Sequence, residues 1–115
     1  MKTLTRIALF LALFQAAACL AAPVSIQVTL GASATQISAT LNCRWFTIQN
    51  NAAHSARAGD STVTSSKGVY LAAGPGGGSW QPPIVQGAGI FNLAQWYIVG
   101  TSSDVIDVTC DSVAF

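Results

Sequence analysis

Two cysteines far apart in the chain, Cys43 and Cys110, restrict the fold more than any other feature of the sequence. The third cysteine, Cys19, lies in an N-terminal segment that we expect to be removed during export, and two cysteines in an oxidising compartment normally pair. A disulfide would bring the strand around Cys43 next to the C-terminal strand, either in one sheet or across the core, with Cα atoms roughly 4.4–6.8 Å apart. The rival interpretation is two free thiols or a zinc site. This interpretation is disfavoured because the further ligands of a zinc site are missing: His54 is the only histidine, and no Cys-x-x-Cys motif is present.

The first 21 residues have the layout of a secretory signal. Lys2 and Arg6 are basic, residues 7–14 are apolar, and residues 15–22 are mostly small. The apolar stretch is shorter than the ~20 residues that span a membrane, so we expect a cleavable signal helix and no membrane span after processing. Cleavage after Ala21 would leave residues 22–115 as one exported domain, in the bacterial periplasm or outside the cell. Two alternatives are cleavage after Ala18 and lipoprotein processing, in which Cys19 would be acylated.

Removal of Lys2 and Arg6 leaves three basic residues against four acids, a formal charge of −1. Basic and aromatic residues alternate only at 44–46, which is too little for a groove that follows phosphates. The sequence therefore predicts no nucleic-acid partner.

Short runs of β-branched and aromatic residues, separated by Gly, Pro, Asn and Ser, predict an all-β protein. In the first run, Val24, Ile26, Val28 and Leu30 alternate with polar residues, which is typical of a strand with one buried face. In the second run the apolar face changes near Trp45, which predicts a bulge or bend there. About eight strands favour a single small antiparallel β-sandwich, or a small barrel. The expected strands are residues 24–30, 37–49, 54–58, 61–65, 69–73, 90–93, 96–99 and 105–113.

Groups that carry out catalysis are scarce in this sequence. It has no Glu, and Asp107 and Asp111 would lie roughly 13 Å apart along one strand, too far for a carboxylate couple or a shared metal. His54, Ser55 and Asp60 are the residue types of a hydrolytic triad, but no Gly-x-Ser-x-Gly motif accompanies them. The glycine run at 74–78 lacks the Gly-Lys-Ser/Thr of a phosphate-binding loop, so it indicates flexibility or close backbone approach. We predict no enzyme activity, no metal and no cofactor.

Aromatic side chains are the remaining candidates for contact with a ligand or partner. Trp80 follows the glycine run, and Trp96 and Tyr97 are adjacent in an expected strand, where they would point to opposite faces. Core packing is the competing role for each ring.

Several segments between Phe46 and Val108 resemble small structural proteins from tailed-phage and prophage gene clusters. They are residues 48–51 (Ile-Gln-Asn-Asn), 57–60 (Arg-Ala-Gly-Asp), 68–71 (Gly-Val-Tyr-Leu), 92–101 (Asn-Leu-Ala-Gln-Trp-Tyr-Ile-Val-Gly-Thr) and 104–105 (Asp-Val). The resemblance implies a non-enzymatic β-module on a head or tail surface, and it carries over no functional residue. A signal peptide and a disulfide depart from that pattern and suggest an exported bacterial relative.

Two main hypotheses follow for the function. The first is an exported, non-catalytic β-module with a structural or protein-interaction role, like the phage virion surface components that it resembles. The alternative is a small secreted carbohydrate-binding, lectin-like module that uses Trp80 and either Trp96 or Tyr97. A small hydrolase would instead depend on His54.

Overall fold

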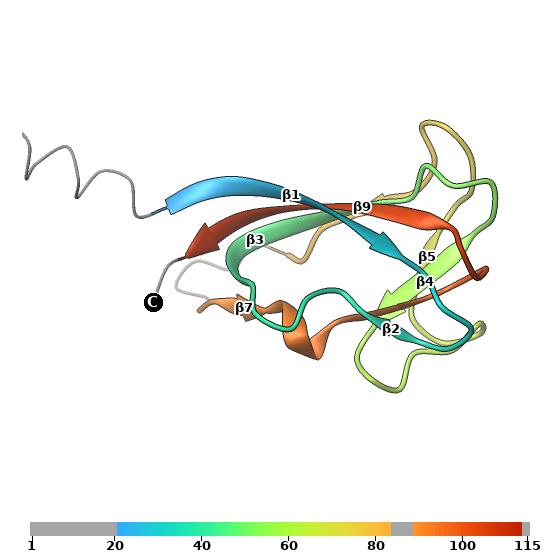
Figure 1. The fold of residues 1–115 in the computed structure, drawn as a ribbon, viewed down its shortest axis with the longest axis horizontal. Helices are drawn as coiled ribbons and strands as arrows, with labels where there is room; N and C mark the ends of the chain where they lie inside the picture. Colours follow the sequence, from blue (N-terminus) through green and yellow to red (C-terminus); the bar gives the residue numbers. More distant parts are fainter. Residues whose placement is uncertain (1–20, 84–88, 114–115) are drawn as a thin grey trace, which may run out of the picture.

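A computed structural model shows an all-β domain made of two antiparallel sheets (Figure 1). It describes residues 21–83 and 89–113, so the predicted signal lies, apart from Ala21, outside the described residues. The first sheet has the strand order β1-β9-β3-β6, with β7 also paired to β3, and the second has the order β2-β8-β4-β5. The first sheet contains β1 (Ala21–Thr29), β3 (Asn42–Gln49), β6 (Ser79–Trp80), β7 (Phe91–Asn92) and β9 (Val105–Val113). The second contains β2 (Thr35–Gln36), β4 (Ala56–Gly59), β5 (Val69–Leu71) and β8 (Tyr97–Val99).

The alternation predicted for the first strand is confirmed. Val24 and Ile26 are partly buried and Val28 is buried, while Ser25 and Gln27 are exposed. β1 pairs along its whole length with β9, from Ala21 opposite Val113 to Thr29 opposite Val105 (Figure 1). The strand forms because its side chains alternate in polarity over a sheet with one face on the core.

The predicted bulge is also confirmed, and it lies between Cys43 and Phe46 of β3. Cys43 is opposite Ser112 and Phe46 is opposite Cys110, so β3 holds one residue more than β9 over this stretch. Residues three apart in a regular strand point to opposite faces, and the extra residue turns both Cys43 and Phe46 inward. Trp45 in the bulge is exposed.

The predicted disulfide joins Cys43 to Cys110, and their Cα atoms are 5.6 Å apart. Both cysteines are completely buried, and their strands are neighbours in the first sheet. The bond therefore ties the bulged strand to the C-terminal strand from the inside of the domain.

One core lies between the two sheets, because its buried members come from both. Phe46, Ile48 and Val108 belong to the first sheet, while Leu71 and Ile98 belong to the second. None of the helices in the described residues is long and apolar enough to cross a membrane.

Three expected strands are lost, divided or shortened by more than two residues in the structure. Residues 61–65 form turns with one isolated bridge between Thr64 and Lys67, because the Asp60 carboxylate accepts hydrogen bonds from the Thr62 N–H and hydroxyl and bends the chain. The strand expected at 37–49 begins only at Asn42. The run 90–93 is divided between β7 and a short 3₁₀ helix, η1 (Leu93–Gln95), whose N-cap is Asn92.

Candidate functional site

Trp80 and Trp96 meet at one side of the core, although they are distant in sequence. Their ring centroids are 5.2 Å apart, and both rings contact the completely buried ring of Phe46, at 6.0 and 5.1 Å. Phe91 contacts Phe46 from another direction, at 5.6 Å. Both tryptophans are partly buried, so each ring combines a packing role with an accessible surface.

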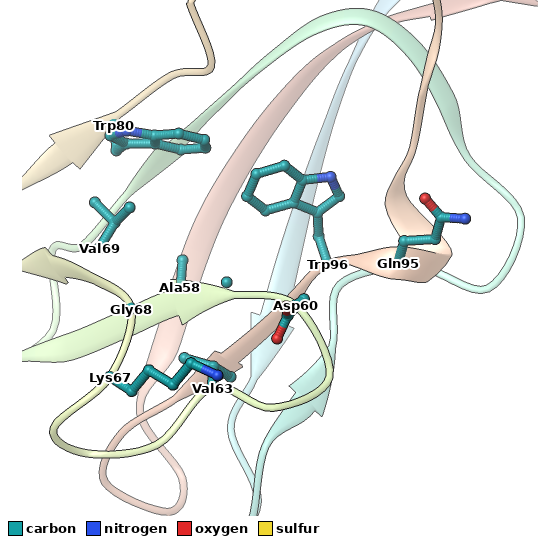
Figure 2. A pocket seen from close by; sticks show the side chains of 10 residues that line it. Ala58, Asp60, Val63, Lys67, Gly68, Val69, Trp80, Gln95 and Trp96 are labelled. Atoms are coloured by element: carbon teal, nitrogen blue, oxygen red, sulfur yellow. The ribbon is translucent and has the colours of Figure 1, made fainter.

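The accessible parts of Trp80 and Trp96 line an open cavity of about 530 Å³, which we call the Trp80–Trp96 groove. Figure 2 shows the two indoles on one side, facing the loop between β4 and β5. Trp80 comes from the edge strand β6 of the first sheet, whereas Val69 comes from the edge strand β5 of the second. The groove therefore lies where the edges of the two sheets meet. The other lining residues are Ala58, Gly59, Asp60, Val63, Lys67, Gly68 and Gln95.

Three polar side chains, those of Asp60, Lys67 and Gln95, surround this mainly apolar lining. Hydrogen bonds from the Thr62 hydroxyl (2.6 Å) and N–H (2.8 Å), together with the Lys67 ammonium, hold the pKa of Asp60 below its ordinary value. Asp60 is therefore an anion at neutral pH, and Lys67 donates to the same Thr62 hydroxyl at 2.6 Å. Within the described residues, neither the Gln95 amide nor the two indole N–H groups have a hydrogen-bond partner.

The loop that carries Asp60 and Lys67 is fixed by Arg57 of β4. The guanidinium donates to the carbonyl oxygens of Ser65, at 3.1 Å, and Gly68, at 2.9 Å. It also lies 5.3 Å from the ring centroid of Tyr70, a cation–π contact. One wall of the groove is thus held in place by contacts within the chain.

Tyr97, the third aromatic candidate, does not line the groove. It lies in β8, opposite Gln36 of β2 and Gly59 of β4. Trp96 packs against the core, which was the competing role considered for each ring, and Trp96 and Tyr97 are both partly buried.

His54 contacts a residue that the sequence did not connect with it. Its Nδ1 lies 3.0 Å from Oδ2 of Asp104, and the His54 side chain is 57% exposed. Asp60 instead bonds to Thr62, so the three residue types of a triad are not joined to one another. In residues 21–83 and 89–113, no cluster of three or more His, Cys, Asp or Glu side chains could hold a metal.

The sequence identified Trp80 and Trp96 but missed Val63, Lys67 and Gln95. Their place in the groove follows from how β6, η1 and the β4–β5 loop converge, and no local pattern encodes that convergence. Only the Asp60-x-Thr62 spacing, which favours a turn through side-chain bonds to the backbone, could have marked the loop in advance.

No family model matches the chain, and neither a curated protein nor a solved structure matches it.

Proposed function

We propose that the protein is an exported, non-catalytic β-sandwich module that acts by binding a partner protein in the Trp80–Trp96 groove. The role is structural, like that of the phage virion surface components that the sequence resembles. One observation carries the proposal: two partly buried tryptophans line an open apolar groove whose polar rim is fixed in advance. Aromatic-rich, well-ordered concave surfaces are typical of binding sites.

Export is supported by the buried Cys43–Cys110 disulfide, because such bonds persist in oxidising compartments. The signal-like layout of residues 1–21 agrees with this proposal. A non-catalytic role is supported by the bonding of His54 to Asp104 and of Asp60 to Thr62, which leaves these residues engaged in separate local structures.

A second candidate partner is a saccharide, and the rim of the groove favours it. The Gln95 amide and two indole N–H groups without partners in the described residues, together with the Asp60 carboxylate, offer both donors and acceptors beside flat apolar rings. A sugar ring presents the same combination of apolar face and hydroxyl edge.

Site-specific photo-crosslinking tests the protein partner. A benzophenone side chain at position 95, in protein exported by a bacterial host, should give an adduct of discrete mass under near-ultraviolet light. The same group at Trp45, which is 37% exposed and outside the groove, should give none. Adducts from both positions, or from neither, would contradict a protein-binding groove.

A glycan array separates the two candidates. Saccharide binding that falls about 2- to 10-fold in Gln95→Ala, as expected for one lost hydrogen bond, and further in Trp80→Ala would replace the protein partner by a sugar. Trp45→Ala serves as the matched control, because it removes an exposed tryptophan ring that does not line the groove. The groove has no binding role if both the array and the crosslinking are negative.

A further inference from the structure

The two sheets protect their edges unequally. β6, β2 and β5 are edge strands of only two or three residues, and short edges resist pairing with other chains. β1 is also an edge strand, but it runs for nine residues and, among the described residues, pairs only with β9. It contains no charged side chain and no bulge. Charges, bulges and prolines are the common devices that block addition of a strand, and of these β1 has only Pro23, close to its start.

The outward-facing backbone groups of β1 follow from the hydrogen bonds at its end. The Leu30 N–H donates to the Asp104 carbonyl oxygen at 2.8 Å, and the Leu30 carbonyl oxygen accepts from the Ser103 N–H at 2.9 Å. Because backbone groups in an antiparallel ladder point alternately toward and away from the partner, even-numbered residues bond to β9. Ser25, Gln27 and Thr29 therefore direct their N–H and C=O groups away from the sheet.

Pro23 falls on the same outward series, where its missing N–H costs no bond to β9. A strand that pairs with β1 must therefore not place a carbonyl oxygen that needs a hydrogen-bond donor opposite Pro23. An antiparallel copy of β1 centred on Gln27 satisfies this condition, because it puts Ser25 opposite Thr29 of the other copy. Pro23 then lies opposite residue 31, beyond the end of β1.

We propose that β1 pairs antiparallel with β1 of a second copy of this chain, about a two-fold axis at Gln27. The first sheets of the two copies then form one continuous sheet. Each of Ser25, Gln27 and Thr29 exchanges backbone hydrogen bonds with its counterpart, and the uncharged strand brings no like charges together.

The side chains of β1 fit this pairing. Val24 and Ile26 point to the core side but are only partly buried, whereas Val28 and Leu30 further along are buried. In the paired register, Ile26 lies beside Val28 of the second copy and Val24 beside Leu30. Pairing therefore covers apolar surface that the single chain leaves open, and the exposed polar side chains of Ser25 and Gln27 stay in water.

Cysteine crosslinking tests both the pairing and its register. In Gln27→Cys the two new thiols face each other in a hydrogen-bonded pair, with Cα atoms about 5.5 Å apart, which suits a disulfide. In the matched control Ser25→Cys, the two introduced cysteines are offset by four residues, roughly 13 Å along the strands. That distance is too long for a disulfide. We expect a covalent dimer from Gln27→Cys alone on non-reducing gels. A dimer from Ser25→Cys alone would overturn the proposed register.

Light scattering coupled to size exclusion tests the dimer without crosslinking. The unmodified protein should show a dimeric mass at high concentration, and Gln27→Lys should be monomeric because it places two like charges on the axis. Ala73→Lys adds the same charge at an exposed site after β5 and should remain dimeric. A monomer at every concentration, with no crosslink in Gln27→Cys, would overturn the proposal. So would a dimer that Gln27→Lys leaves unchanged.

Discussion

Asn50 is the one polar residue of the described chain that is completely buried, and its side chain joins three segments. The amide donates to the carbonyl oxygens of His54, at 2.9 Å, and Leu71, at 3.2 Å, while its oxygen accepts from the Ala52 N–H at 3.0 Å. The end of β3, the following turn and β5 therefore depend on one amide. The sequence placed Asn50 between two expected strands, residues 37–49 and 54–58, but it did not indicate that Asn50 would be buried.

Asn50→Ala is expected to destabilise the fold by about 2–4 kcal/mol, because it leaves buried backbone groups without partners and opens a cavity. The neighbouring Asn51→Ala is the matched control. Asn51 is exposed. Its amide donates to the Asp107 carboxylate at 3.0 Å and its oxygen accepts from the Gln49 amide at 3.4 Å, and both bonds are exposed to solvent, so the loss should be below about 1 kcal/mol. Urea unfolding of both variants measures the difference, and equal losses would show that Asn50 has no special role.

At the scale of elements, periodicity predicted the long strands well and the short ones poorly. β1 and β9 were anticipated because alternation over many residues is a strong signal, and β9 matches the predicted range 105–113. The bulge in β3 was anticipated because the apolar parity changes at Trp45. Residues 61–65 have strand-like composition, but the side chain of Asp60 bends them into a turn. The groove was not predicted, since it depends on how the edges of two sheets meet.

The glycine run before β6 illustrates close approach of backbones, one of the two roles expected for it. The Gly78 N–H donates to the Ala72 carbonyl oxygen at 2.9 Å, and the Gly78 carbonyl oxygen accepts from the Asn50 N–H at 2.9 Å. A Cβ atom at Gly78 would lie 2.8 Å from the Leu71 Cα, which is shorter than the van der Waals contact distance of two carbon atoms. Only glycine allows β5 and the start of β6 to lie this close.

Gly78→Ala should therefore cost about 1–3 kcal/mol, or a fall in Tm of several degrees for a domain of this size. Gly89→Ala is the control, because a Cβ there meets no atom of the described residues within 4 Å. Thermal melts followed by circular dichroism compare the two. A Gly78→Ala variant as stable as Gly89→Ala would show that the strands can separate at no cost.

For the whole molecule, the decisive constraint is the Cys43–Cys110 bond, which closes a loop across a sequence separation of 67 residues. In the chain-entropy model, a loop of this length contributes about 4 kcal/mol by restricting the unfolded chain. That is a large share of the stability of a domain this small.

Reduction is expected to lower Tm markedly, and the double variant Cys43→Ala/Cys110→Ala should show a comparable loss without reductant. Adding reductant to the double variant controls for other effects and should change nothing. Calorimetry with and without dithiothreitol makes the comparison. An unchanged Tm in the reduced protein would contradict the predicted role of the bond.

The order of strands in the first sheet also sets the timing of folding. β9, between β1 and β3, is the last strand of the described chain to be synthesised. At ~5–20 residues per second, β1 and β3 leave the ribosome several seconds before the strand that joins them. During that interval both lack their main pairing partner, so the nascent chain cannot settle into its native sheet. Such delayed closure keeps the first sheet incomplete until β9 has been synthesised, which agrees with the proposed export of a chain that has not yet folded.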